Sequence, residues 1–102
     1  MAMYVKIHKT GNPHGHQAVI AVCDASLLGK TLREGTITLA ISEGFYKGEK
    51  KTENEVIAIL KQATNVNLVG KEAVNAGLRA GIIEKESILT IEGVPHAQSF
   101  AF

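Results

Sequence analysis

The sequence predicts a small α+β domain whose mixed or antiparallel sheet of about four to six strands has two helices packed on one face. Residues 3–9 and 36–42 alternate apolar and polar side chains with a period of two, which is typical of strands buried on one side. A helix-start signal at Thr52 precedes an apolar stripe at helical spacing. Because the strands come first and are joined by short loops, an antiparallel or mixed sheet is favoured over a doubly wound parallel one.

The first half of the chain is predicted to consist mainly of strands. The strand at 3–9 leads into a loop at 10–16, whose glycines, asparagine and proline predict a hairpin connection. Residues 17–23 form a nearly continuous apolar run, which indicates a strand at the sheet centre or one covered on both faces. Asp24 is then placed to cap a short helical turn, and 36–42 is the clearest strand pattern of the chain. The following stretch 42–51, with two glycines and a cluster of charge, is predicted to be a loop.

The second half is predicted to carry both helices. Thr52 and Glu55 form a capping box, and the helix that it starts should end near residue 63. A second helix is predicted at 70–80, with small side chains along one face, and Gly81 is placed as the left-handed residue that ends it.

The C-terminal segment is predicted to add one strand and then leave the core. The last strand is expected at 87–91, a turn at 93–96, and a loose tail at 97–102. No linker, internal repeat or low-complexity stretch divides the chain, so residues 1–102 are expected to form one domain.

Composition bounds the function as well as the fold. The chain has 102 residues, of which 45% are hydrophobic, and a formal net charge of +1, so bulk charge does not favour binding to a polyanion. Its single cysteine, Cys23, excludes an internal disulfide and a multi-cysteine zinc site. The N-terminus lacks a signal-peptide pattern and no apolar run approaches the roughly 20 residues of a membrane span. A cytoplasmic protein without a cofactor is expected.

Two basic clusters are candidates for contact with nucleic acid. They are Lys30 with Arg33, and Lys47 with Lys50 and Lys51. The second cluster lies beside Phe45 and Tyr46, and a cation next to an exposed ring suits single-stranded RNA. The alternative is that Glu43 and Glu49 dilute the charge and that both rings tuck into the core.

Histidine and cysteine provide two weaker candidates for chemistry. The imidazoles of the first hairpin, which could approach one another around a zinc or nickel ion, are His8, His14 and His16. Their spacing matches no standard metal motif, so solvated surface histidines are the alternative. Cys23 and His96 could form a thiolate–imidazole pair, but a cysteine that ends an apolar strand is usually a small buried hydrophobe.

Polar residues at the ends of predicted elements could form one shared surface. These candidates are Asp24, Lys30, Asn67, His96 and Gln98. If they converge, they make a recognition site on one rim of the sheet. If they diverge, Asp24 and Asn67 serve only as helix N-caps and the others as turn residues.

Four stretches of the chain together carry a family resemblance. They are 19–31 (Val-Ile-Ala-Val-Cys-Asp-Ala-Ser-Leu-Leu-Gly-Lys-Thr), 45–48 (Phe-Tyr-Lys-Gly), 67–70 (Asn-Leu-Val-Gly) and 93–98 (Gly-Val-Pro-His-Ala-Gln). In this order they resemble the archaeal family labelled domain of unknown function 424. The resemblance implies a small archaeal cytosolic α+β protein of a kind sometimes described as predicted RNA-binding. Leu32 departs from the aromatic residue expected at its position, which affects packing more than chemistry.

The leading hypothesis is a non-enzymatic module that binds RNA or the ribosome, with neither DNA nor membrane as a partner. It rests on the resemblance and on the two basic clusters. The alternative is a protein-interaction module, either a homodimer or an adaptor. A third hypothesis is a small enzyme with a polar site centred on His96.

Overall fold

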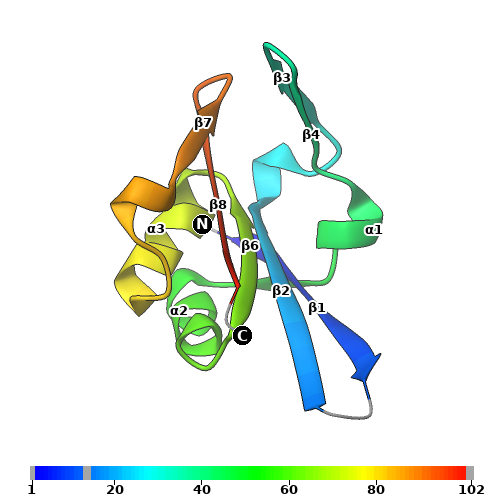
Figure 1. Ribbon diagram of the computed structural model, residues 1–102, viewed down its shortest axis with the longest axis vertical. Coiled ribbons are helices and arrows are strands. Elements are labelled where there is room, and N and C mark those ends of the chain that lie inside the picture. The colour runs from blue at the N-terminus through cyan, green and yellow to red at the C-terminus, as the bar shows by residue number, and fades with distance from the viewer. Residues whose placement is uncertain (1, 13–14, 101–102) are drawn as a thin grey trace.

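The computed structural model describes residues 2–12 and 15–100, with the side chains of 10–12 and 15–17 left out. It builds a six-stranded sheet and a separate two-stranded hairpin (Figure 1). The strands are β1 (Met3–Asn12), β2 (Gly15–Asp24), β3 (Thr31–Glu34), β4 (Ile37–Ala40), β5 (Glu49–Lys51), β6 (Asn65–Val69), β7 (Leu89–Ile91) and β8 (Val94–Phe100). The helices are α1 (Glu43–Tyr46), α2 (Glu53–Lys61) and α3 (Lys71–Ala80), with 3-10 turns η1 (Ala25–Leu27) and η2 (Lys85–Ser87).

The main sheet is mixed, as the sequence predicts. Its strand order is β5-β1-β2-β6-β8-β7. β2 and β6 are parallel, and the other neighbouring strands are antiparallel. The parallel pair needs a crossover connection, and the chain supplies it through the β3–β4 hairpin, α1, β5 and α2. β2 lies between β1 and β6, which confirms the prediction of a central strand.

One face of the sheet is covered by α2 and α3 (Figure 1). Val56 and Leu60 of α2 pack with Val22 and Leu68 of the sheet, and all four are fully buried. A Cβ on Gly77 would overlap the side chain of Leu68. The glycine therefore lets α3 approach the sheet closely, as its predicted small face implies.

The other face is covered only towards the end of the sheet that contains Cys23. There η1, the β3–β4 hairpin and α1 lie on the side opposite α2 and α3 (Figure 1). Leu32, Ile41 and Tyr46 from these elements bury Cys23 and Val69. This second cluster is made of short pieces, so it covers part of the face and leaves the rest open.

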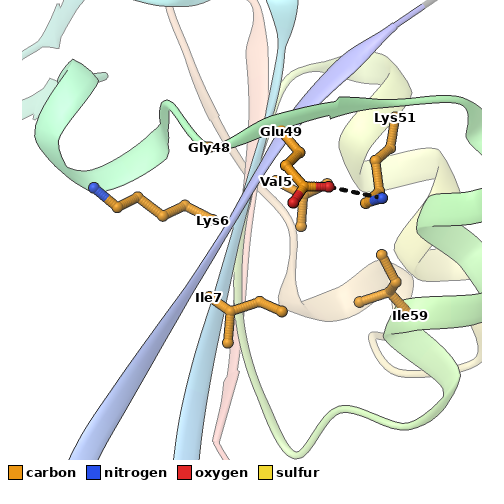
Figure 2. A pocket seen from close by; sticks show the side chains of 7 residues that line it. All are labelled: Val5, Lys6, Ile7, Gly48, Glu49, Lys51 and Ile59. Atoms are coloured by element: carbon orange, nitrogen blue, oxygen red, sulfur yellow. Dashed lines mark ion pairs between the residues drawn. The ribbon is translucent and has the colours of Figure 1, made fainter.

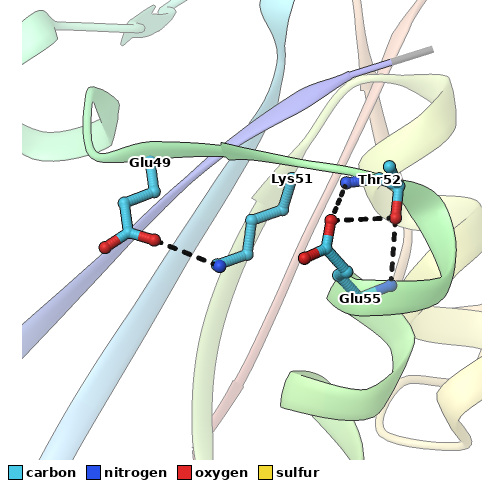
Figure 3. A network of polar contacts seen from close by, with 4 residues as sticks. All are labelled: Glu49, Lys51, Thr52 and Glu55. Carbon is cyan, nitrogen blue, oxygen red and sulfur yellow. Dashed lines mark hydrogen bonds and ion pairs between the residues drawn. The ribbon is translucent and has the colours of Figure 1, made fainter.

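The predicted helix signals are confirmed. The Thr52 hydroxyl accepts from the Glu55 backbone N–H at 3.4 Å, and the Thr52 backbone N–H donates to Glu55 Oε1 at 3.0 Å (Figure 3). The hydrogen bonds that the Thr52 backbone N–H and hydroxyl donate to Glu55 Oε1 hold the pKa of Glu55 below its ordinary value. Gly81 ends α3 with φ of 76°, in the left-handed region.

Two predictions about the path of the chain are wrong, and one strand appears where no element was predicted. Residues 65–69, between the two predicted helices, form β6. Residues 97–100 are not a loose tail but belong to β8, which pairs with β6 and β7; the last two residues lie outside the described part. The reason is the turn at Glu92 and Gly93, whose φ angles of 52° and 78° suit a tight two-residue hairpin and return the chain into the sheet. The expected loop at 42–51 also contains α1 and β5.

The strand predicted most clearly is real but lies outside the main sheet. β4 pairs only with β3, and Ile37 is 45% exposed. Among the described residues, no helix has the length and apolarity that crossing a membrane requires.

Candidate functional site

The register of the sheet brings three of the predicted site residues together. Asn67 of β6 lies directly opposite Gln98 of β8, and Val69 lies opposite His96. Directly opposed residues share one face of a sheet. Asn67, His96 and Gln98 therefore gather on the face away from α2 and α3, beside Tyr46 of α1.

Tyr46 sets the orientation of the Asn67 amide. The Tyr46 hydroxyl donates a hydrogen bond of 2.6 Å to Asn67 Oδ1. Burial, with a smaller contribution from Cys23, raises the pKa of Tyr46 to about 12, so the hydroxyl stays protonated as the donor. With its oxygen held, the half-buried Asn67 keeps its amide N–H groups for other partners.

His96 sets the orientation of Gln98 in the same way. His96 Nδ1 lies 2.9 Å from the Leu68 carbonyl oxygen, which can only accept, so Nδ1 carries the proton. In the neutral ring Nε2 is then an acceptor, and it receives the Gln98 amide nitrogen at 3.1 Å. The Gln98 side-chain oxygen is left to accept from outside.

Aromatic and basic side chains continue this arrangement across the sheet. The His8 ring stacks on Phe45 with centroids 4.6 Å apart and an interplanar angle of 16°. His8 Nε2 also lies 2.8 Å from the Phe45 carbonyl oxygen and donates to it. Lys6 Nζ donates to the Gly44 carbonyl at 2.7 Å, and Lys50 Nζ lies 5.5 Å from the centre of the Tyr4 ring.

These residues form two adjacent rows across four strands. The rows are Lys6–Ala21–Asn67–Gln98 and His8–Val19–Asn65–Phe100. Phe45 stacks on the His8 end of the second row, and Phe100 at the other end is 55% exposed. We call the two rows together with Phe45 the polar sheet face.

Asp24 does not join the polar sheet face, although the sequence offers it as a site residue. Its carboxylate accepts from the backbone N–H groups of Glu72 at 3.1 Å and Ala73 at 2.8 Å, and it is only 8% exposed. A Cβ on Gly70 would overlap the carboxylate. Asp24 thus caps α3 from a distant strand, and its side chain makes no capping bond to η1.

The two basic clusters also do not merge. Lys30 and Arg33 are exposed at the β3–β4 hairpin. Within β5, Lys50 lies opposite Tyr4 on the α1 side, whereas Lys51 lies opposite Met3 on the α2 side. Lys51 there pairs with Glu49 at 3.1 Å (Figure 3), and Lys47 is exposed after α1. Of the neighbouring rings, Tyr46 is buried and Phe45 is half-buried.

Of the three hairpin histidines proposed as metal ligands, only His8 has a described side chain. His8 is engaged with Phe45, His14 lies outside the described residues, and the side chain of His16 is likewise not described. No three histidine, cysteine or acidic side chains gather as a metal site within residues 2–12 and 15–100.

Cys23 and His96 are held apart by the sheet. Val69 of β6 lies between them in the register, so their backbones are two strand spacings, about 10 Å, apart. Burial, helped by the charge of Asp24, raises the pKa of the Cys23 thiol to about 11, so it is protonated at neutral pH. Both ring nitrogens of His96 have hydrogen-bond partners, the Leu68 carbonyl oxygen and the Gln98 amide.

Sequence reasoning missed the residues that connect the predicted ones. The sequence predicts Lys6 only as a strand residue and Phe100 only as a tail residue, and it leaves Tyr46 open between an exposed ring and a core ring. The alternation in 65–69, with asparagine at every second position before an apolar residue, is the available signal for β6, whereas Asn67 is predicted only as a site residue or a helix N-cap.

The fold and the site together define a small mixed-sheet α+β domain with one face packed by α2 and α3 and one partly open polar face. The chain belongs to the family described as "Protein of unknown function (DUF424)", whose profile matches residues 12–102, and the resemblance seen in the sequence is confirmed. The crystal structure of an uncharacterized conserved protein from Methanopyrus kandleri is similar, with 30% identity and a TM-score of 0.81 over 96% of this chain and 90% of that chain. No curated protein matches the sequence.

Proposed function

We propose that this protein binds single-stranded RNA, free or exposed on a ribosomal particle, across the polar sheet face. The observation that carries the proposal is the pair of rows with an aromatic group at each end, the His8–Phe45 stack and Phe100. Bases of single-stranded RNA stack on such rings, and sheets present them at fixed spacing. Lys6, at one end of the first row, and Lys50, on the neighbouring strand β5, supply charge for the phosphates.

The oriented amides support recognition of bases and not only of the backbone. Asn67 offers N–H groups and Gln98 offers a carbonyl oxygen, because Tyr46 and His96 occupy their other ends. A donor beside an acceptor is what the polar edge of an unpaired base requires. The two side chains lie directly opposite on adjacent strands, so one base can reach both.

The charge of the chain limits the electrostatic part of this binding. With a net charge of +1, contacts come from the local group Lys6, Lys47 and Lys50. For a single strand each phosphate contact changes the slope of log K against log salt by about −0.7, so three contacts predict a slope of about −2. We propose the cytoplasm as the site of action, since RNA and ribosomes are available there.

The test is fluorescence anisotropy of a labelled single-stranded RNA of about ten nucleotides, a length within the usual site sizes, measured against salt. Phe100→Ala removes an exposed ring and should weaken binding at least about fivefold, because a stacked base contributes ~1–3 kcal/mol. The matched control is Ile7→Ala, since Ile7 is 50% exposed on the other face and should leave binding unchanged.

A second pair of variants tests the charge. Lys50→Ala should lower the salt slope by about 0.7, whereas Lys61→Ala on α2, on the far face of the sheet, should not. Absence of binding at low salt to both single-stranded RNA and ribosomal particles would overturn the proposal. Equal losses from Phe100→Ala and Ile7→Ala would also overturn it, because binding would not then depend on the polar sheet face.

A further inference from the structure

The outer edge of β1 is only partly paired. β1 pairs with β2 along its whole length, from Met3 to Asn12. On its other side β5 covers only Met3 to Val5. Beyond Val5, no strand of the described part of the chain lies along β1. Free backbone N–H and C=O groups along such an edge are a template for a further strand.

Gly48, directly before β5, lies against the backbone of β1. A Cβ at Gly48 would overlap the Val5 carbonyl, so the backbone touches β1 at this point. Before Gly48 the chain comes from α1 on the opposite side of the sheet. The edge after Val5 is therefore left open by the path of the chain.

An apolar groove runs beside this open edge (Figure 2). It has a volume of about 230 Å³ and is lined by Val5, Ile7 and Ile59, with the Glu49–Lys51 ion pair at one end. Lys6 points away from the groove towards α1 (Figure 2). Pockets for drug-sized molecules have volumes of about 300–1,000 Å³, so the groove suits a single apolar side chain. Ile7 at its mouth is 50% exposed.

We propose that the edge of β1 binds an extended peptide from another protein by strand addition. The peptide continues the line of β5 and so runs antiparallel to β1. It places an apolar side chain opposite Ile7, in the groove, and an acidic side chain opposite the exposed Lys9. Because opposed residues share a face and the strands are antiparallel, the acidic residue comes two positions before the apolar one.

The charge of the edge argues against a second copy of this chain as the partner. Two copies that paired the whole free edge, residues 6–12, around a two-fold axis would place Lys9 opposite Lys9 of the second copy. Like charges directly opposed destabilise a strand pair. An acidic residue at that position has the opposite effect, so the occupant is a different chain.

The test is an NMR titration of the full-length protein with a synthetic peptide that has Glu two positions before Leu in a threonine-rich extended sequence. The backbone amides of Ile7, Lys9 and Ile59 should shift. A control peptide with Lys in place of Glu should bind about fivefold more weakly. With the Lys9→Glu protein the preference between the two peptides should reverse. Phe100→Ala, on the polar sheet face, should not change peptide binding, so this proposal and RNA binding can fail separately.

Three results would overturn the proposal. The first is the absence of shifts at these amides at millimolar peptide. Lys9 would then serve only to prevent aggregation through the β1 edge. The second is equal binding of the two peptides by both protein variants. The third is a dimer of the free protein, seen by light scattering, that covers the β1 edge, because the occupant would then be a second copy.

Discussion

The two faces of the six-stranded sheet differ in what holds their side chains. The helix-covered face is filled by buried apolar residues that α2 and α3 seal along most of the sheet. The polar sheet face is held by directional contacts, Tyr46 to Asn67 and His96 to Gln98, and short elements cover it only at one end. The domain therefore obtains most of its stability from the helix-covered face, and the polar sheet face carries oriented polar groups.

The same contrast appears in two of the three buried polar side chains of the sheet strands, since the third, Asp24, caps α3. Asn65 and His96 are buried, and both face away from α2 and α3. Buried polar groups are costly unless they are hydrogen-bonded, and His96 has a partner for each ring nitrogen. Satisfied polar contacts of this kind specify one arrangement of the face more than they add to stability.

The largest expected effect comes from the helix-covered face. Leu68→Ala should lower the free energy of unfolding by ~2–5 kcal/mol, because Leu68 is fully buried against α3 and leaves a cavity. Denaturant unfolding measures it. The control Ile7→Ala removes a half-exposed side chain and should cost about 1 kcal/mol or less. If Leu68→Ala costs no more than this control, the helix-covered face is not the main source of stability.

The next effect is the dependence of stability on pH, to which two buried groups of the partly covered face contribute. The pKa of Cys23 rises from 9.0 to about 11 in the folded protein, and that of Tyr46 rises from 10.0 to about 12. Both groups bind protons more tightly when folded, so their contribution is complete below pH 9 and is lost as the pH rises towards 12. For Cys23 the loss is about 2–3 kcal/mol. In denaturant titrations at pH 8 and 11, Cys23→Ala should lose less stability than the parent protein, and equal losses contradict the assignment.

The variant Asp24→Ala tests whether Asp24, which caps α3 from the end of β2, acts in stability or in binding. Asp24→Ala leaves the N–H groups of Glu72 and Ala73 without their acceptor and should cost ~1–3 kcal/mol. Hydrogen exchange should accelerate in the first turn of α3. The exposed neighbour Ser26 gives the control Ser26→Ala, with an effect within about 0.5 kcal/mol. A loss of RNA affinity without a loss of stability would return Asp24 to the binding site.

The smallest effect concerns the polar sheet face itself. Tyr46→Phe removes the hydrogen bond to Asn67 and should cost ~0.5–1.5 kcal/mol of stability. Because the Asn67 amide is then free to rotate, discrimination among RNA homopolymers should fall more than overall RNA affinity. Anisotropy with the four homopolymers measures it, with Phe45 and His8 unchanged as the stacking pair. Unaltered discrimination would show that the amide orientation does not read bases.

Local signals in the sequence were sufficient for several elements. The Thr52–Glu55 capping box and the Gly81 C-cap depend on residues within one turn, so sequence proximity determines them. The strand at 17–23 could be placed at the sheet centre because only a strand covered on both faces carries such an apolar run. The arrangement of the polar candidates was predicted in part. Asn67, His96 and Gln98 lie on one face of the sheet, as the alternative of a shared surface requires, whereas Asp24 caps α3.

Non-local contacts decided the rest. β6 and β8 contain asparagine or proline, which are weak strand formers alone. They form because each pairs with neighbours on both sides. β4 has the stronger pattern but pairs only with β3. A period of two in the sequence predicts a strand, but it does not show with which other strand that strand pairs.

The order of apolar, polar and turn residues by itself determined the class of fold, the helix ends and the absence of a disulfide within the chain. Only the tertiary structure decided that Asp24 serves α3, that the lysines divide between two sides of β5, and that Asn67 and Gln98 face one another in fixed orientations. The distinction follows from how far apart the contacting residues lie along the chain. Caps and periodicity involve residues a few positions apart, whereas these contacts join residues far apart along the chain, such as Tyr46 with Asn67, 21 positions apart, and Asp24 with Ala73, 49 positions apart.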